Sequence, residues 1–134
     1  MSEDNLNVIR DHFEATNERD FPRAMRHYAK DVELSVAPSG FLETGTVKGR
    51  DAVGHWFGRW LATFEPDYRF DLEELRDLGD AVLVVAADGG RGRSSGVEVH
   101  TATAYLYRLD QGKTVHAALY RTRDEALEAA GLSE

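Results

Sequence analysis

The stretch that most constrains the fold is VEVHTATAYLYRLDQGKTVHAALYRT, which spans residues 97–122. It holds two runs of strand-forming residues on either side of Asp110-Gln111-Gly112, and glycine tolerates the positive φ that tight hairpin turns require. The stretch therefore predicts an antiparallel hairpin around this turn. The predicted cross-strand pairs are Leu109 with Lys113, Tyr107 with Val115, Tyr105 with Ala117, Thr103 with Leu119 and Thr101 with Arg121.

The two faces of this hairpin differ in chemistry, because successive side chains point to opposite sides of a strand. The face that carries Tyr105 is apolar with hydroxyl groups and one cation, which is typical of a pocket wall. The opposite face is small and flat, which suits packing against another sheet. Its residues are His100, Ala102, Ala104, Leu106, His116, Ala118 and Tyr120.

Apolar periodicity and turn residues predict an α+β fold, with helices on one face of a curved antiparallel sheet. Asp20 and Pro22 are start signals for the second of the helices. The predicted helices cover residues 3–18, the segment from Asp20 onward, 49–64 and 123–130. The predicted strands cover residues 31–36, 67–77, 80–88, 97–109 and 113–121. Residues 37–48 contain proline and two glycines and are predicted to form an irregular loop.

Length and composition predict a single domain over residues 1–134. The net charge of −8 would repel a phosphate backbone, so we expect no nucleic-acid partner. No apolar run approaches the ~18 residues that a membrane span needs, and MSEDNLNVIRDHF is not a signal peptide, so we expect no membrane partner. The lack of cysteine excludes disulfides and fits a cytoplasmic protein.

Two features that could indicate a cofactor or a metal do not meet the requirements. GGRGRSSG, at residues 89–96, lacks the GxGxxG spacing and no helix is predicted after it, so it predicts no phosphate cradle. The histidines form no H-x-H or H-x-x-x-H pair, which argues against a metal site. We therefore expect no cofactor and no metal.

Three segments carry a resemblance to a known superfamily. They are HFEATNERDFPRAMRHYAKDVEL, VKGRDAVGHWFGRWLATF and DQGKTVHAALYRTRDEALEAAGL, and together they cover most of the chain. The chain resembles the SnoaL-like group of the nuclear transport factor 2-like superfamily, which includes polyketide cyclases and is similar to the ketosteroid isomerases. The resemblance implies a cone-shaped barrel, in which a strongly bent antiparallel sheet wraps on three N-terminal helices around a deep apolar pocket. It also implies a homodimer through the convex face of the sheet, which would consist of Ala102, Ala104, Leu106, Ala118 and Tyr120.

The resemblance places the isomerase site on residues of different chemistry. The catalytic tyrosine of the isomerases falls on His12, and their oxyanion-hole acid falls on Tyr105. Their general-base carboxylate falls on Val36, which cannot take a proton, so the sequence argues against ketosteroid isomerase activity. An aromatic pocket residue falls on Trp56, and a tryptophan near the end of the last strand falls on Arg121.

Three residues are candidates for catalysis, and each has a structural alternative. His12 titrates near neutral pH, but it can also be a surface histidine or a hydrogen-bonded structural one. Tyr105 can donate to a ligand oxygen or tie its hydroxyl into the core. Asp88 lies at a strand end with its facing left open, and Arg121 could pair with it, with an anionic ligand or with water.

The predicted ligand wall combines apolar side chains with a few polar points. Tryptophans at helical spacing are also typical of ordinary core packing, so Trp56 and Trp60 have two interpretations. The apolar wall is predicted to hold Phe13, Trp56, Phe57, Trp60, Leu61, Val99, Ala117 and Leu119. The polar points are predicted to be His12, Thr101, Thr103, Tyr105, Tyr107 and Arg121.

Such a wall predicts a small, largely apolar, oxygenated ligand, for example a carbonyl or carboxylate compound held by Tyr105 or Arg121. Phosphorylated ligands are disfavoured. The sequence leaves three classes of function open. The first is cofactor-free isomerisation, cyclisation, dehydration or hydrolysis. The second is small-molecule binding without catalysis, and the third is a dimeric interaction module whose cone is filled by its own aromatic side chains.

Overall fold

The computed structural model describes residues 2–36, 45–79 and 81–131, which form one sheet and several helices. The helices are α1 (Ser2–Asn17), α2 (Phe21–Met25), α3 (Arg50–Ala62) and α4 (Arg123–Ala129). The strands are β1 (Tyr28–Val36), β2 (Gly45–Lys48), β3 (Arg69–Asp77), β4 (Val82–Arg91), β5 (Glu98–Asp110) and β6 (Lys113–Tyr120). Within these ranges no helix is both long enough and apolar enough to cross a membrane.

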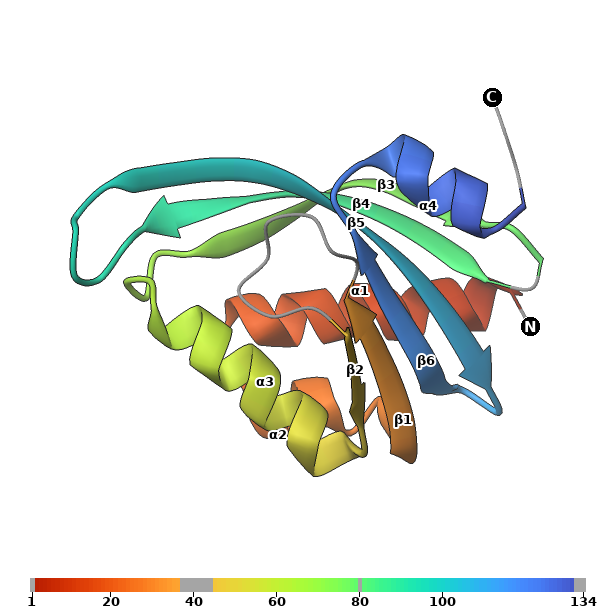
Figure 1. Cartoon of the computed structure of the whole chain (residues 1–134). Helices are drawn as coiled ribbons and strands as arrows, with labels where there is room; N and C mark the ends of the chain where they lie inside the picture. Colours follow the sequence, from red (N-terminus) through yellow and green to blue (C-terminus); the bar gives the residue numbers. More distant parts are fainter. Residues whose placement is uncertain (1, 37–44, 80, 132–134) are drawn as a thin grey trace.

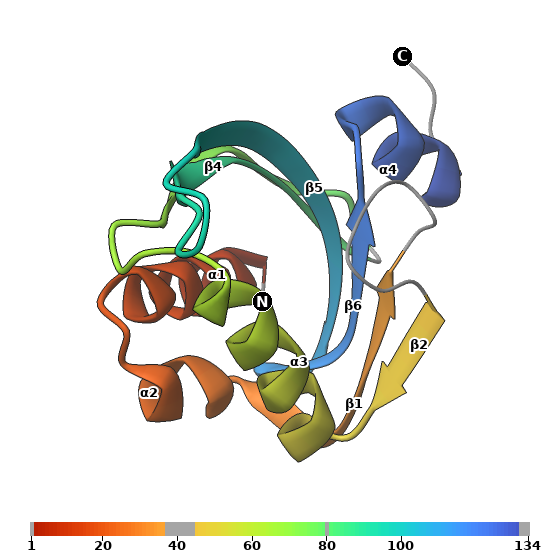
Figure 2. The same cartoon turned by 60° about the vertical axis from the view of Figure 1, so that its left-hand side comes forward.

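The sheet has the order β2-β1-β6-β5-β4-β3 and bends around three helices (Figures 1 and 2). Helices α1, α2 and α3 lie on its concave side, and α4 lies on its convex side. This arrangement confirms the predicted α+β fold with a bent sheet wrapped on three N-terminal helices. Strands β2 and β3 are the two edges of the sheet, so the barrel is open.

Two details of the sheet differ from the prediction. Strands β1 and β6 are parallel, so the prediction of a wholly antiparallel sheet is wrong at this pair. Strand β2 pairs with β1 and lies inside the region predicted as a loop. The sequence did not predict this strand, because a segment of only four residues that begins with glycine gives too short a pattern to recognise. The rest of that predicted loop, residues 37–44, lies outside the described residues.

Helix boundaries follow local signals. The Asp20 carboxylate accepts a hydrogen bond from the backbone N–H of Arg23 at 3.3 Å, and Pro22 occupies the first turn of α2, where a missing N–H costs little. Gly49 precedes α3 with a φ of 94°, a conformation that glycine adopts without strain. These signals confirm the predicted starts of α2 and α3.

The turn between β5 and β6 is shorter than predicted. It consists of Gln111 and Gly112, with φ values of 51° and 78°, and Asp110 pairs directly with Lys113. Positive φ at both central residues matches the right-handed twist of the two strands. The predicted pairing of Leu109 with Lys113 is therefore wrong by one residue.

A bulge in β6 adds a second residue to this shift. Val115 has no partner on β5, and beyond it Tyr105 lies opposite Leu119 rather than Ala117. Beyond the bulge the combined shift is two residues, and a strand alternates with a period of two, so the residues from His116 onward keep their predicted faces. Between the turn and the bulge the shift is one residue, so Lys113 lies opposite Asp110 and not on the predicted face of Leu109.

Most of the convex face that was predicted to form the homodimer is covered within the chain. Ala104, Leu106 and Ala118 are buried against Ala126 and Leu127 of α4. These three residues of the predicted dimer face are therefore covered by the final helix, which folds back onto the sheet. The remaining two residues of that face differ, since Ala102 is exposed and Tyr120 is half-buried. The homodimer itself stays a prediction.

We expect Gly90→Ala to destabilise the protein, because an added Cβ would lie 2.6 Å from the Cα of Tyr68. Backbone atoms cannot move aside easily, so the free energy of unfolding should fall by about 1–3 kcal/mol. Gly58→Ala is the matched control, since its Cβ meets no atom within 4 Å and alanine favours a helix interior by about 0.5–1 kcal/mol. Urea denaturation measures both variants, and an unchanged midpoint for Gly90→Ala would contradict the close approach.

Candidate functional site

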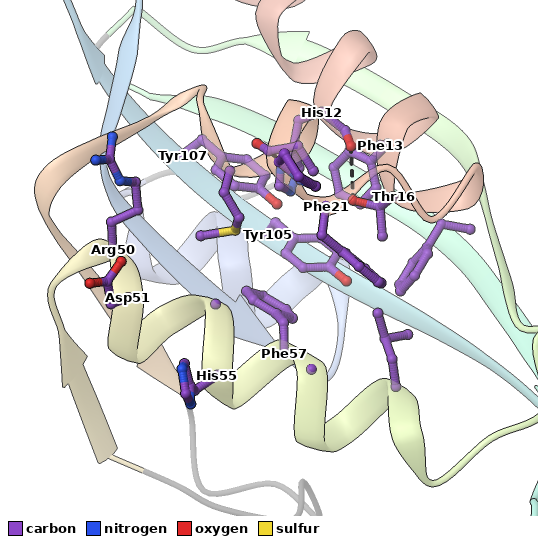
Figure 3. A pocket seen from close by; sticks show the side chains of 17 residues that line it. His12, Phe13, Thr16, Phe21, Arg50, Asp51, His55, Phe57, Tyr105 and Tyr107 are labelled. Carbon is purple, nitrogen blue, oxygen red and sulfur yellow. Dashed lines mark hydrogen bonds between the residues drawn. The ribbon is translucent and has the colours of Figure 1, made fainter.

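A cavity of about 460 Å³ lies between the helices and the concave face of the sheet (Figure 3). Its wall comes from α1, the segment at α2, α3, Phe70 of β3, and Tyr105 and Tyr107 of β5. Arg50 and Asp51, at the start of α3, lie at its edge. The lining residues are His12, Phe13, Thr16, Phe21, Pro22, Ala24, Met25, Arg50, Asp51, Gly54, His55, Phe57, Gly58, Leu61, Phe70, Tyr105 and Tyr107.

Part of the predicted wall is brought together here. The residues predicted for the wall and found in it are His12, Phe13, Phe57, Leu61, Tyr105 and Tyr107. They come as three pairs, one from each of three elements, and the two members of a pair face the same way. The pairs are His12 and Phe13 on the buried stripe of α1, Phe57 and Leu61 four residues apart on α3, and Tyr105 and Tyr107 at alternate positions of β5. Their roles toward a ligand stay predictions.

Four predicted apolar wall residues are buried away from the cavity. Trp56 and Trp60 pack in the core with ring centroids 6.3 Å apart. They lie on one edge of a broad aromatic stripe, whereas the cavity borders the other edge, at Phe57 and Leu61. The other two, Ala117 and Leu119, are also in the core and do not line the cavity. Periodicity identified all four as buried but not which of them border empty space.

The polar points on the strands differ most from the prediction. The Arg121 side chain is 64% exposed and forms an ion pair with Glu125 at 3.4 Å, so it is not an inward cation. It follows the last residue of β6 and belongs to the connection to α4. Thr101 is exposed and Val99 is half-buried, near the far end of β5, where this strand extends past the helices (Figure 1). Neither residue lines the cavity.

Sequence reasoning missed the α2 side of the wall and the glycines of α3. Gly54 and Gly58 lie four residues apart on the helix face that borders the cavity. Phe21 and Met25 close the side opposite to them. A pair of glycines at helical spacing beside an aromatic stripe was a usable signal, because such residues leave space where a side chain would otherwise pack.

His12 is buried, and one hydrogen bond defines its protonation. Its Nδ1 lies 3.0 Å from the carbonyl oxygen of Ala24, which can only accept, so Nδ1 carries the proton. Burial is the main cause that lowers the pKa of His12 to about 4, so the ring is neutral at pH 7. The Nε2 lone pair then faces the hydroxyl of Tyr28 at 3.4 Å, and the two rings stack with centroids 4.9 Å apart.

The tyrosines of β5 extend this polar arrangement along the cavity. Tyr105 and Tyr107 stack with centroids 5.7 Å apart and an interplanar angle of 13°. The His12 ring lies near both Tyr107 and Tyr28, with centroid distances of 6.3 Å and 4.9 Å. Burial raises the pKa of both β5 tyrosines well above the ordinary value, so both are protonated at pH 7.

Asp88 lies inside the cone, behind the cavity wall. Its carboxylate accepts hydrogen bonds from the hydroxyls of Tyr68 and Thr103, the latter at 3.1 Å, and Asp88 is only 3% exposed. Burial raises its pKa to about 6, against the opposite effect of the two hydrogen bonds. Thr103, predicted as a polar point of the wall, is buried, and neither it nor Asp88 lines the cavity. The suggested pairing of Asp88 with Arg121 is not present.

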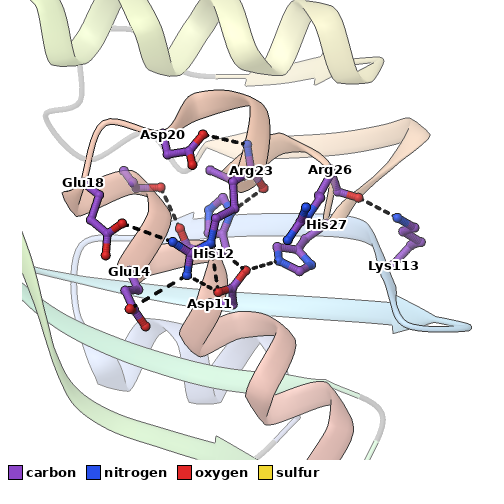
Figure 4. A network of polar contacts seen from close by, with 11 residues as sticks. Asp11, His12, Glu14, Glu18, Asp20, Arg23, Arg26, His27 and Lys113 are labelled. Atoms are coloured by element: carbon purple, nitrogen blue, oxygen red, sulfur yellow. Dashed lines mark hydrogen bonds and ion pairs between the residues drawn. The ribbon is translucent and has the colours of Figure 1, made fainter.

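A polar network outside the cavity holds α2 against α1 (Figure 4). The Asp11 carboxylate accepts hydrogen bonds from the Arg23 guanidinium and lies 2.6 Å from Nε2 of His27. The hydrogen bond from Arg23, followed by that from His27, lowers the pKa of Asp11 to about 2. Because Arg23 directly precedes Ala24, this network fixes the carbonyl group that orients His12.

The part of the chain that the structure describes holds no cluster of metal-binding side chains. In residues 2–36, 45–79 and 81–131, no three His, Cys, Asp or Glu side chains are placed to hold a metal ion together. The stretch GGRGRSSG forms the end of β4 and the turn into β5, and the element that follows it is a strand. The charged cavity residues Arg50 and Asp51 lie at its edge, not at its buried end (Figure 3).

We expect the neutral form of His12 to be the Nδ1–H tautomer and its pKa to be about 4. The free energy of unfolding should depend on pH in the range set by this lowered pKa. The pKa of His12 is lower in the folded chain than the unfolded value of 6.5, so its contribution is complete above pH 6.5 and lost as pH falls toward 4. The loss is on the order of 3 kcal/mol. Nitrogen-detected NMR of His12 measures the tautomer and the pKa. The unfolding free energy of the wild type minus that of His12→Asn, measured against pH, isolates the pH dependence that is due to His12. A proton on Nε2 at pH 7 would contradict the hydrogen bond from Nδ1 to the Ala24 carbonyl.

Comparisons with known proteins agree with this fold. A family model described as SnoaL-like domain matches residues 9–117. An NTF2-like protein from Burkholderia thailandensis is 28% identical, with 87% of this chain and 88% of that chain covered and a TM-score of 0.76. Bal32a, from a soil-derived mobile gene cassette, is 17% identical over 88% of each chain, with a TM-score of 0.79. TerC, co-crystallised with polyporic acid, is 17% identical over 93% of this chain and 96% of that chain, with a TM-score of 0.76.

A search of curated proteins finds no match. The structural likenesses below 25% identity show the fold alone, because one fold hosts many functions. The family model is more specific, since its match begins in α1, ends in β6 and includes every strand between them. With the bent sheet and the helices on its concave side, this match shows that the chain belongs to the SnoaL-like domain family, which has the nuclear transport factor 2-like fold.

Proposed function

We propose that this protein binds a small, largely apolar molecule in the cavity between the three N-terminal helices and β5. The observation that carries the proposal is the cavity wall, in which aromatic and aliphatic side chains surround a few hydroxyls and one imidazole. A volume of about 460 Å³ is in the range of small-molecule sites. Phe21, 41% exposed, also places an apolar ring where a ligand would enter.

Two further observations support small-molecule binding over the alternative of an interaction module with a filled cone. TerC, which has the same fold, was co-crystallised with polyporic acid. An interaction module whose cone is filled by its own aromatic side chains does not fit a cavity of this volume, because Trp56 and Trp60 pack beside the cavity rather than in it. The cavity therefore favours small-molecule binding.

Cofactor-free acid–base catalysis is the second candidate, and the imidazole of His12 favours it. This ring is neutral and lines the cavity. Its Nε2 lone pair faces the Tyr28 hydroxyl at 3.4 Å, so Tyr28 would have to turn away before Nε2 could take a substrate proton as a general base. Val36, at the position of the isomerase base, is buried in the core from β1 and offers no proton acceptor. A catalytic role would therefore rest on His12 with the tyrosines around it, and not on the carboxylate of the isomerases.

Gly58→Leu should weaken binding of naphthalene, used as an apolar probe, by about tenfold or more. Gly58 lines the cavity, and a Cβ added there meets no atom within 4 Å, so a leucine side chain would extend into ligand space. Ala62→Leu is the matched control, because Ala62 is exposed on the same helix and outside the wall. Isothermal titration calorimetry compares the two variants. Equal affinities in both would place the binding site elsewhere.

Turnover in His12→Asn separates catalysis from binding alone, because asparagine can still donate to Ala24 but offers no imidazole base. With 2-naphthyl acetate as a hydrolysis probe, loss of a general base should lower turnover by about 10²- to 10⁴-fold. Affinity for naphthalene should be unchanged, which shows that the cavity is intact. Ordinary turnover in the variant would rule out His12 as an essential base.

A further inference from the structure

Four arginines are half-buried in the part of the chain that the structure describes. Burial removes water from a cation, so a half-buried guanidinium normally has protein acceptors around it. The Arg19 guanidinium donates to three backbone carbonyls at distances of 2.6 to 3.2 Å. Arg23 and Arg123 each form ion pairs with carboxylates. The fourth, Arg50, is held differently from these three.

Arg50 has a single hydrogen bond to the described residues and forms no ion pair with them. Its Nη1 lies 3.4 Å from the carbonyl oxygen of Tyr28. An N–H···O bond is usually about 2.7–3.2 Å long, so this one is weak. A guanidinium carries several N–H donors in a planar fork, and most of those on Arg50 therefore stay available to another acceptor.

These donors belong to a residue at the edge of the cavity. Arg50 begins α3 and contributes to the cavity wall (Figure 3). Its charged neighbour in the wall, Asp51, is exposed, and water screens an exposed charge more strongly than a half-buried one. An acidic side chain in the first turn also stabilises a helix through the helix dipole, whereas a cation there does not. The dipole accounts for Asp51 and leaves Arg50 unexplained.

We propose that the cavity takes an apolar carboxylic acid, whose hydrocarbon part lies among the aromatic side chains and whose carboxylate binds the Arg50 guanidinium at the edge. This inference rests on the proposed binding function and names the class of ligand. A carboxylate matches the planar fork of a guanidinium, with which it forms paired hydrogen bonds. At the edge, the charged group also keeps contact with water, so it does not bear the full cost of burial.

The proposal changes the cation that the sequence predicted for a carboxylate ligand. That cation was Arg121, which is exposed and paired with Glu125. Arg50 takes its place because the start of α3 packs near the start of β1, where the Tyr28 carbonyl holds one guanidinium nitrogen. These two segments are distant in the sequence, so the sequence alone did not bring Arg50 to the cavity.

Three probes with one ring system test the proposal: 2-naphthoate, 2-naphthamide and naphthalene. The first two have nearly the same shape and differ in charge at neutral pH. Isothermal titration calorimetry on the wild type should show that 2-naphthoate binds about tenfold or more tightly than 2-naphthamide. In Arg50→Met, which keeps an apolar chain and removes the donors, the two should bind equally. Arg50→Lys keeps the charge but not the fork, so it should retain only part of the preference.

Two further variants separate a specific contact from a general effect of charge. Arg59→Met removes the same charge from the same helix outside the cavity wall, so the preference for 2-naphthoate should persist. Gly58→Leu fills part of the cavity, so it should weaken 2-naphthoate by about tenfold or more, as it does naphthalene. Naphthalene affinity in Arg50→Met and Arg59→Met should equal that of the wild type, which shows that the cavity is intact.

The outcomes distinguish failure of the inference from failure of the proposed function. Equal affinities for 2-naphthoate and 2-naphthamide in a wild type that binds naphthalene overturn the inference alone. The same holds for a preference that survives Arg50→Met, for one lost equally in Arg59→Met, and for 2-naphthoate binding that Gly58→Leu leaves unchanged. A wild type that binds none of the three probes shows that the proposed binding function has failed, and the inference with it.

Discussion

The hydrogen bond between the His12 imidazole and the Ala24 carbonyl is the interaction on which the site depends. An imidazole inside an apolar cone loses solvation, which keeps it neutral and makes any unpaired nitrogen costly. The carbonyl takes the Nδ1 proton and so leaves a single tautomer, which the Tyr28 hydroxyl then completes. The same bond joins α1 to α2, and the Asp11 network on the outside holds the same two helices together.

The cavity exists because one edge of α3 carries two glycines, which have no side chains to fill the space beside the helix. Trp56 and Trp60 fill the core on the other edge, where they make several ring contacts. Gly54 and Gly58 leave the adjacent edge open, and the flexible side chain of Met25 would lie 3.4 Å from a Cβ added at Gly54. One helix thus stabilises the cone and also leaves room in it. This division of roles explains why an aromatic helix borders a cavity without filling it.

Asp88 is a buried carboxylate whose charged form is disfavoured by burial. Its pKa is higher in the folded chain than in an unfolded one, so the folded state is less stable with Asp88 ionised, above pH 6, than with it protonated. Two hydroxyl donors offset part of that cost, and Gly90 allows the backbone of one donor, Tyr68, to approach closely. A carboxylate in the core also gives the Tyr68 and Thr103 hydroxyls a fixed direction. An apolar residue at this position would leave that direction undefined.

The sequence by itself determined the helices, most strands, the alternation of β5 and the apolar stripe of α1, because these depend on residues close together in the chain. It also placed part of the wall correctly, including Phe57 and Tyr105. Tertiary structure alone decided the parallel pairing of β1 with β6, the bulge at Val115 and the ion pair that draws Arg121 outward. It also decided which buried side chains border empty space, because the bend of the sheet and the rotation of α3 set that boundary. A periodic pattern reports that a residue faces inward, but the atoms that it meets there come from elements distant in the sequence.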